Sequence, residues 1–366
     1  MNTRLEYTHD ELMADPDYAS RLRRNGILFH GGLDRDGGYL PPRSRFRTPA
    51  IHAWTERLAA DGHPTQVISL DRVKRDFFPT VAQSAVLLRN GAKGAMTRIL
   101  TLIGITEGFG NDGIKLMPPL NLSQFFKESV EGTCLAHLHK GLFEAHGNDE
   151  AGRGDEAGHD VMWYAIRDAA LDSPRITPDM FENLPIAPPP GYTGPAKPAP
   201  EALSVGELMK QLYPNVDPLF EMMLSAMAQI LVIELLAFST FAWAREVLAD
   251  ASCSSAPDFA PQMVDYIQAD ESIHVAYLQC ALAEARSRTI VTQDGTEIPG
   301  TLFIDAICDK MVANQMGGRW DRMMAYRMGQ IRAELEERRD GEQVLAQFTG
   351  CGPIPTPATT PVARSA

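Results

Sequence analysis

One long apolar run dominates the hydropathy pattern of the chain. Residues 222–245 read MMLSAMAQILVIELLAFSTFAWAR, and a single carboxylate, Glu234, interrupts the run near its middle. A helix that is apolar on nearly every face suits either a membrane span or the central helix of a large bundle. Gln229 and Glu234 near the centre, with no Lys/Arg cluster at one flank, favour the bundle. A buried carboxylate is costly when it is alone, so Glu234 should be paired, protonated or bound to a metal.

A second helical pattern begins after residue 257, with apolar residues at spacings of three and four. It contains Glu271 and His274, which a helix places on one face with Cβ atoms roughly 5–6 Å apart. Ser252 marks the centre of the turn between the two patterns and is nearly equidistant in sequence from Glu234 and Glu271. In an antiparallel hairpin, these two carboxylates should therefore stand at the same height.

The remaining patterns predict an all-α fold in three parts. Residues 1–78 form an N-terminal extension that carries additional helices, and residues 79–340 form a helical bundle. Residues 172–200 are so rich in proline that they predict an irregular crossover between two helical hairpins. A further C-terminal helix is expected before residue 340, and residues 341–366 are expected to be a disordered tail.

Within the bundle, helices are expected over residues 80–107 and 122–146. Residues 108–113 match the dinucleotide fingerprint G-x-G-x-x-G, but that fingerprint requires a preceding strand and a following helix. Prolines follow here instead, so a loop between helices is the interpretation that the sequence favours.

Composition narrows the possible partners. A net charge of −13 disfavours nucleic acid and anionic membrane surfaces as partners. The five cysteines include no Cys-x-x-Cys pair, which is typical of reduced thiols and argues against a disulfide framework. The N-terminus lacks an apolar leader, and we therefore expect a cytoplasmic protein. Arg43, Arg45 and Arg47 are expected to pair with the surplus of acidic side chains.

The pattern Asp-Glu-x-x-His occurs twice, at residues 270–274 and at residues 155–159, where it opens another helical pattern. A single Glu facing a Glu-x-x-His pair on the adjacent helix is half of a four-helix dimetal carboxylate site. The competing interpretation is that both are surface i,i+3 pairs that only support helices. The metal ligands predicted from these patterns are Glu156, His159, Glu234, Glu271 and His274.

The other single Glu is ambiguous. Glu131, which precedes Glu156 by 25 residues, is preferred because it adjoins small residues that would let helices approach each other. The alternatives are Glu144, Glu128 and Glu107, and His137, His139 or His146 could substitute for a carboxylate. Asp155 and Asp270 could accept hydrogen bonds from the ligating histidines. Trp163, four residues after His159, is expected to be a structural aromatic.

Such a ligand set, with four carboxylates, two imidazoles and no thiolate, suits iron or manganese, and four Glu would neutralise two divalent ions. On these residues the chain resembles the ferritin-like dimetal carboxylate superfamily, which includes ribonucleotide reductase small subunits, monooxygenases and desaturases. The resemblance covers roughly residues 120–290. It implies a ferritin-like four-helix bundle with two Fe ions, or an Fe/Mn pair, and O2 as co-substrate.

The resemblance further implies an oxidase or oxygenase that acts on a small organic or fatty substrate, a separate reductase, and a homodimer. Two other classes compete with this one. A metal-storage protein of the ferritin type would be much shorter than this chain, and a non-catalytic helical scaffold would tolerate loss of Glu234 or Glu271. The proline-rich crossover and the segment before residue 122 could supply a substrate pocket, which favours the enzyme.

Overall fold

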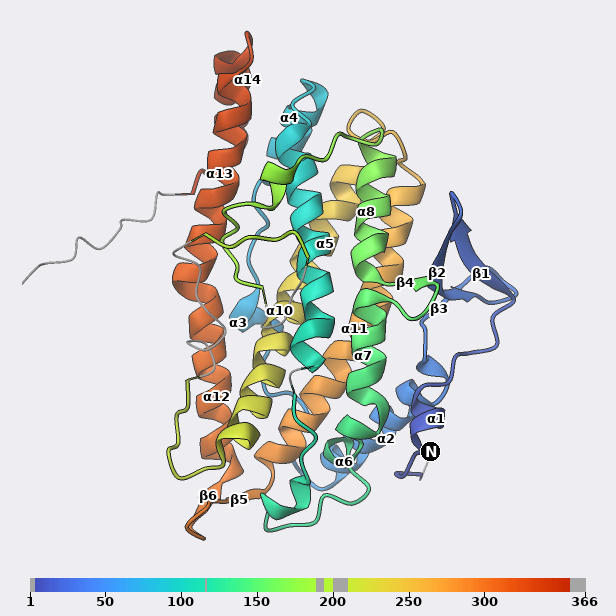
Figure 1. The fold of residues 1–366 in the computed structure, drawn as a ribbon, viewed down its shortest axis with the longest axis vertical. Coiled ribbons are helices and arrows are strands. Elements are labelled where there is room, and N and C mark those ends of the chain that lie inside the picture. Colours follow the sequence, from blue (N-terminus) through green and yellow to red (C-terminus); the bar gives the residue numbers. More distant parts are fainter. Residues whose placement is uncertain (1–3, 116, 189–193, 200–209, 356–366) are drawn as a thin grey trace, which may run out of the picture.

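A computed structural model describes residues 4–115, 117–188, 194–199 and 210–355. The described residues are mostly helical, so the predicted all-α class is confirmed (Figure 1). Long helices at the centre pack side by side, and α7 and α8 continue each other along one line. These helices are α5 (Gly94–Lys115), α7 (Phe143–Ala151), α8 (His159–Ala170), α10 (Pro218–Ala249) and α11 (Phe259–Arg286).

The helix α10 is the apolar run identified in the sequence. Asp217 caps its N-terminus by accepting hydrogen bonds from the backbone N–H groups of Leu219 and Phe220, and Pro218 occupies its first turn. In length and composition α10 would also be able to cross a membrane, a property that core helices of soluble proteins share. Here it lies between the other central helices, where its buried Leu, Met and Phe side chains each contribute about 1.5–3 kcal/mol.

The direction of the helices follows from their connections. The helices α5 and α11 run down the view of Figure 1, whereas α7, α8 and α10 run up it. A long crossover, which includes the proline-rich residues 172–200, therefore joins the top of α8 to the bottom of α10. Its described part contains one short helix, η3 (Pro178–Phe181), and buries Leu184 and Ile186 against α5.

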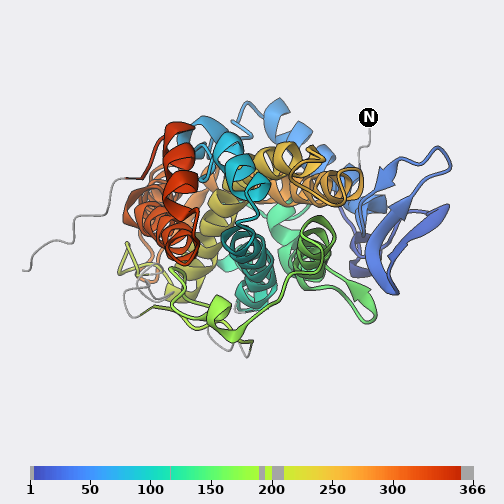
Figure 2. The ribbon, with the colours of Figure 1, turned by 90° about the horizontal axis from the view of Figure 1, so that it is seen from above.

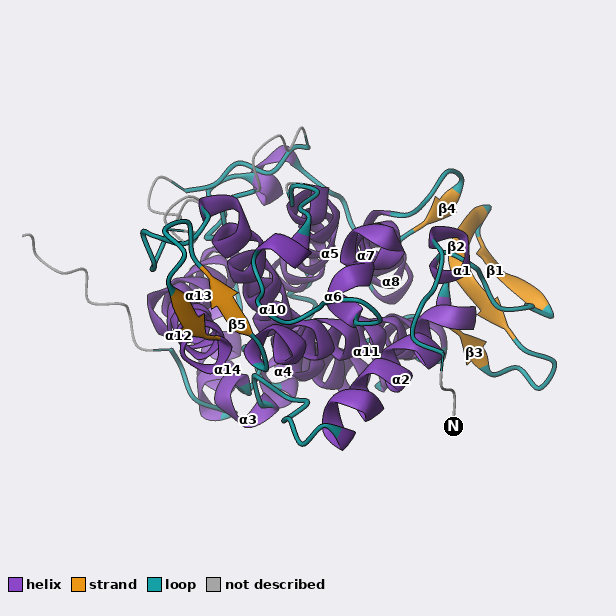
Figure 3. Cartoon of the chain, turned by 90° about the horizontal axis from the view of Figure 1, so that it is seen from below, coloured by secondary structure: helices purple, strands orange, loops and turns teal. Residues whose placement is uncertain are grey.

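The N-terminal segment contains a small sheet that the sequence patterns did not predict (Figure 3). Its strands β1 (Ser20–Arg24) and β2 (Ile27–Leu33) form a hairpin whose turn residues, Asn25 and Gly26, both have positive φ, as two-residue hairpin turns require. The strand β3 (Tyr39–Leu40) pairs antiparallel with β2, and β4 (Glu156–Ala157), from between α7 and α8, pairs parallel with it. Helices α1 (His9–Leu12), α2 (Ser44–Ala60) and α3 (Leu70–Val73) complete this segment.

The C-terminal helices cover the opposite side of the central helices from the sheet (Figure 2). A hairpin of β5 (Thr289–Val291) and β6 (Glu297–Pro299) leads into them. They are α12 (Gly300–Asn314), a π-helical turn η4 (Gln315–Arg319), α13 (Trp320–Glu336) and α14 (Gly341–Gly350). The helix α14 corrects the expected disordered tail over residues 341–350, because Val344 and Phe348 are buried where it packs on α4 (Val81–Arg89).

The expected loop over residues 108–113 is also wrong, because α5 continues as a helix to Lys115. Conversely, the expected helix over residues 122–146 is broken into several pieces. Gly141 has φ of 137°, which a continuous helix excludes. The pieces are η1 (Leu122–Gln124), α6 (Cys134–His137), η2 (Leu138–Leu142) and the start of α7.

Candidate metal centre

Seven side chains that can ligate a metal converge between the central helices. They form two groups that share Glu150. Six of them are buried, and Glu107 is half-buried because it also borders a cavity. The seven are Glu107 from α5, His146 and Glu150 from α7, His159 from α8, Glu234 from α10, and Glu271 and His274 from α11.

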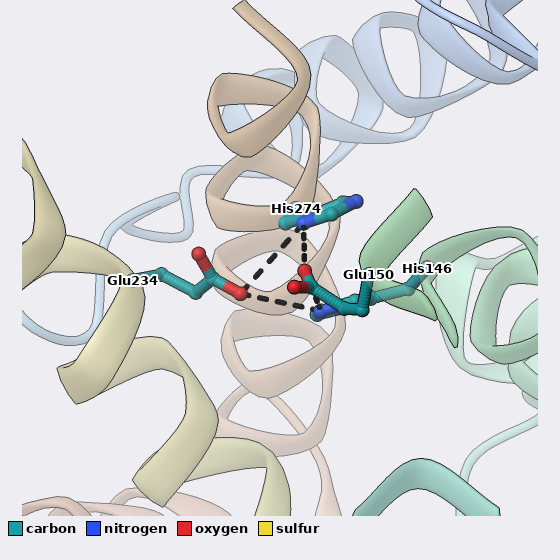
Figure 4. A group of neighbouring side chains, drawn as sticks. All are labelled: His146, Glu150, Glu234 and His274. Atoms are coloured by element: carbon teal, nitrogen blue, oxygen red, sulfur yellow. Dashed lines mark ion pairs between the residues drawn. The ribbon is translucent and has the colours of Figure 1, made fainter. Parts of the chain in front are cut away.

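The first group brings together one oxygen each of Glu150 and Glu234 and one nitrogen each of His146 and His274 (Figure 4). His146 Nε2 lies 3.3 Å from Glu150 Oε1 and 3.2 Å from Glu234 Oε1. His274 Nδ1 lies 3.3 Å and 3.7 Å from the same two oxygens. Atoms that bind one ion at about 2.1 Å lie roughly 3 to 3.5 Å from one another, so this spacing fits a single metal ion.

The second group combines Glu107, Glu150, His159 and Glu271, whose ligand atoms all lie within 4.8 Å of one another. His159 Nδ1 lies 2.9 Å from Glu271 Oε1 and 3.5 Å from Glu150 Oε2. This group has the same donor types as the first, with one histidine fewer.

Glu150 and Glu271 each direct one oxygen to each group. Glu150 presents Oε1 to His146 and His274 and Oε2 to His159. Glu271 presents Oε2 to His274, at 2.6 Å from Nδ1, and Oε1 to His159. Two bridging carboxylates are what a pair of adjacent ions requires, and each group then has one further Glu of its own.

The unsatisfied atoms of the centre indicate the kind of group that it holds. Several of its buried atoms have no hydrogen-bond partner: His146 Nε2, His159 Nδ1, Glu271 Oε1 and both oxygens of Glu150. Unsatisfied buried polar groups are costly, and these all face the space between the two groups. Two divalent ions would bind these atoms and would neutralise the four Glu, so the donors fit a dimetal centre.

The electrostatics of the carboxylates support the same conclusion. Burial, together with the charges of Glu150 and Glu234, raises the pKa of Glu271 to about 7. Removal from water, followed by the charges of Glu271 and Glu150, raises the pKa of Glu107 well above its ordinary value. Without a cation, these carboxyl groups therefore retain protons that the binding of metal would displace.

Each ligating histidine is held by a partner behind it. His159 Nε2 donates to Asp270 Oδ2 at 3.2 Å, and His274 Nε2 donates to Asp149 Oδ2 at 2.9 Å. His146 Nδ1 lies 2.8 Å from the hydroxyl of Tyr277. These contacts fix the ring orientation and leave the other nitrogen free to bind metal.

The N-terminal segment holds those partners in place in turn. Asp270 Oδ2 also accepts hydrogen bonds from His30 Nε2 at 3.0 Å and from the Tyr39 hydroxyl at 2.8 Å. Both donors come from the sheet, from β2 and β3. His30, His159 and Asp270 could themselves be taken for a metal site. Because Asp270 accepts hydrogen bonds from His30, His159 and Tyr39 together, we interpret this group as the support of His159, whose Nδ1 faces Glu150 and Glu271.

Asp149 is supported by arginines from the start of α2. Arg47 Nη2 donates to Asp149 Oδ2 at 2.7 Å, and Arg43 Nε donates to Asp149 Oδ1 at 2.9 Å. Burial opposes ionisation of Asp149, but the charges of Arg43 and Arg47 outweigh it and hold the pKa of this carboxyl well below its usual range. The expected pairing with acids is present for all three arginines. Arg43 and Arg47 pair with Asp149, and Arg45 pairs with Asp17.

The structure places four of the six predicted ligands in the centre and two outside it. His159, Glu234, Glu271 and His274 belong to the two groups, and Glu234 and Glu271 stand at matching heights on their hairpin, both beside His274. Glu131 is a correction, because it lies exposed in the loop before α6. Of the alternatives to Glu131, Glu107 joins the centre, whereas Glu128 contacts Thr289 and Glu144 contacts His9.

Glu156 is the second correction. It lies in β4 rather than in a helix, and its carboxylate pairs with Arg21 of β1. Its role in the centre falls to Glu150, because residues 152–158 leave the helix line between α7 and α8 and return to it. A Cβ added to Gly158 would lie 2.3 Å from the backbone N of Gly152, so the loop closes on itself only where both positions lack side chains. Glu150 and His159 thus lie on one helix line, with this loop between them in the sequence.

Glu107, one of the alternatives to Glu131, is followed by the glycines of residues 108–113. They lie inside α5, where they let it approach its neighbours closely. A Cβ on Gly110 would lie 2.8 Å from Glu150 Cγ, and a Cβ on Gly108 would contact Asp160. Trp163 Nε1 then donates to Glu107 Oε1 at 3.0 Å, so this aromatic orients a ligand as well as filling the core.

Sequence reasoning missed Glu150, and it named His146 only as a possible substitute for a carboxylate. The signal was the spacing of four between them, which puts both on one face of α7. Their neighbour Asp149 has the same relation to His274 that Asp270 has to His159. Asp155, the counterpart of Asp270 in the other motif, is exposed.

A cavity of about 320 Å³ adjoins the centre. Glu107, Glu150 and Glu234 form part of its wall, and most of the remainder is apolar, from α5, α10 and α13. Its size is that of a small-molecule site.

Comparison of the chain with protein-family models, with curated proteins and with solved structures found no match. The functional interpretation therefore depends on the residues and geometry described above.

Glu150→Ala should lower the bound Fe(II) or Mn(II) from about two ions per chain to one or none, because Glu150 contributes an oxygen to both groups. Glu156→Ala should retain about two ions, because Glu156 faces Arg21 instead. Elemental analysis after anaerobic loading measures both variants. Loss of metal in Glu156→Ala with retention in Glu150→Ala would show that the helical motif predicted from the sequence is the true ligand pair.

Asp270→Asn should weaken metal affinity by roughly 10- to 100-fold, because His159 loses its charged acceptor. Asp155→Asn is the matched control, since Asp155 holds the same position in its motif but is exposed. Competition with a colorimetric chelator gives both affinities. Equal metal affinities in the two variants would show that Asp270 does not support the metal-binding histidines.

Proposed function

We propose that this chain is a ferritin-like dimetal carboxylate protein that uses two Fe ions, or an Fe/Mn pair, and O2 to oxidise a small organic substrate. The observation that carries the proposal is that Glu150 and Glu271 each direct one oxygen to each of the two groups, beside an apolar cavity. The up-and-down helices with one long crossover are the connectivity that such bundles use.

The chain's own residues divide the work. Glu107 and His159 would hold one ion, Glu234, His146 and His274 the other, and Glu150 and Glu271 both. The ions, when bound, supply the binding and reduction of O2. The apolar wall of the cavity excludes water from the substrate, and Asp149 and Asp270 keep the histidines in the required tautomer.

The centre differs from the six-ligand pattern that the sequence predicted, because His146 adds a third imidazole. A neutral donor leaves the charge balance between four Glu and two divalent ions unchanged. It adds one ligand to the first group alone, so the two ions would have unequal coordination. Glu107 and His159 would thus offer fewer ligands than the other group, and both groups have a carboxylate, Glu107 or Glu234, that borders the cavity where a substrate would lie.

Metal storage is less well supported, because storage does not need an enclosed apolar cavity. A non-catalytic scaffold is disfavoured by the cost of burying so many unsatisfied ligand atoms. As part of the proposal, electrons for repeated turnover come from a separate reductase.

Anaerobically loaded Fe(II) protein should consume about one O2 per two Fe(II) on mixing with oxygenated buffer, measured with an oxygen electrode and by the ultraviolet absorption of the oxidised iron. Glu271→Ala should abolish the reaction, because it removes a bridging oxygen from both groups. Glu131→Ala should leave it unchanged, because Glu131 is exposed in a loop.

Two outcomes would contradict the proposal. Iron uptake that continues far beyond two ions per chain would identify storage. Absence of O2 consumption in protein that carries its full iron would leave a metal-stabilised scaffold.

A further inference from the structure

The wall of the cavity beside the candidate metal centre carries arginines as well as carboxylates. Arg319, from the π-helical turn η4, and Arg327, from α13, line it together with the ligands Glu107, Glu150 and Glu234. The helix α13 packs against α5, and α12, which leads into it, packs against α10. The cavity is therefore lined both by candidate metal ligands and by arginines.

Arg327 is the more deeply buried of the two and has no acidic partner among the described residues. Only 9% of it is exposed, and its Nη1 donates to the backbone carbonyl of Phe78 at 2.8 Å. Its guanidinium lies 4.1 Å from the centre of the Phe77 ring, and its Nε has no hydrogen-bond partner. Burial alone lowers the pKa of Arg327 to about 9, so no carboxylate offsets its desolvation.

Arg319 is in a similar position one turn after Gln315. Burial, and then the charge of Arg322, lower the pKa of Arg319. Arg322 itself has buried Nε and Nη2 atoms without hydrogen-bond partners. In the described part of the chain, none of these arginines forms an ion pair, although other buried arginines do, as Arg43 and Arg47 do with Asp149.

An unpaired buried arginine is costly. Acidic partners are abundant in this chain, whose net charge is −13. Unpaired buried guanidinium groups that line a cavity are the usual recognition groups for carboxylates. Most of the rest of the wall is apolar, with side chains such as Ile103, Ile230 and Met323. The cavity thus has an anion-binding part and an apolar part.

We propose that the cavity binds an amphipathic carboxylic acid, with its carboxylate at Arg319 and Arg327 and its apolar body against the apolar lining from α5 and α10. In the metal-free chain, the acidic side chains of the cavity wall repel the carboxylate, and the arginines attract it. The orientation therefore presents a carbon of the apolar body, and not the acid group, to the metal centre. This assignment of the oxidised position rests on the proposed function, whereas the binding of the acid does not.

Binding of dodecanoate to the metal-free chain tests the proposal, followed by calorimetry and by the fluorescence of Trp320, which lines the cavity. Dodecanoate should bind at least about tenfold more tightly than dodecanol, because only the acid pairs with the arginines. Arg319→Gln and Arg327→Gln should each lose about tenfold or more of that affinity. Arg332→Gln, an exposed position on the same helix, should bind as the parent does.

Arg327 is buried, so its variant could fail to fold, and thermal unfolding of each variant accompanies the titrations. Arg319 is only half-buried, and its variant carries the test if Arg327→Gln is unstable. Equal affinity for dodecanoate and dodecanol, or unchanged affinity in a folded Arg319→Gln, would overturn the proposal.

The two proposals fail separately. Dodecanoate binding in Glu150→Ala, without O2 consumption in the iron-loaded parent, would support the anion site and refute the oxidase. O2 consumption by the iron-loaded parent, together with equal affinity for dodecanoate and dodecanol, would support the oxidase and refute the anion site.

Discussion

Mutual repulsion among carboxylates that have been removed from water is the constraint on which this fold depends. Three buried Glu and one half-buried Glu meet within a few ångströms, and they arrive from separate helices. Hydrophobic burial along α10 and α11 brings those helices together, yet the same burial strengthens every uncompensated charge between them. In the metal-free chain the cost is reduced by retained protons and by charged histidines. A pair of divalent ions would remove it.

The rest of the molecule holds the ligand side chains in place despite this electrostatic cost. The loop over residues 152–158 separates Glu150 from His159 in sequence but returns the chain to the same helix line. It also supplies β4, which ties the centre to the N-terminal sheet. That sheet and the start of α2 then provide His30, Tyr39 and the arginines that position Asp270 and Asp149. The N-terminal segment is therefore part of the site rather than an appendage to it.

The sequence predicts the parts of the fold where one local pattern is long and unbroken. The apolar run with Glu234 and the helix with Glu271 and His274 form a hairpin at the expected height, because their periodicity extends over several turns. Glu107 and Glu150 could not be selected in the same way. The glycines after Glu107 allow two helices to approach each other closely and do not form a turn. The sequence alone does not distinguish these two roles, because the packing partner decides which one applies. Glu156 matched a helical motif, but strand pairing with β2 outweighs its helical spacing.

The central claim is that Glu150 and Glu271 bridge two ions. Anomalous diffraction at the iron absorption edge, from crystals grown anaerobically with Fe(II), tests it most directly. The account predicts two peaks roughly 3.5–4 Å apart, one beside Glu234 and His274 and one beside Glu107 and His159, with Glu150 and Glu271 between them. A single peak, or peaks only among His30, His159 and Asp270, would contradict it.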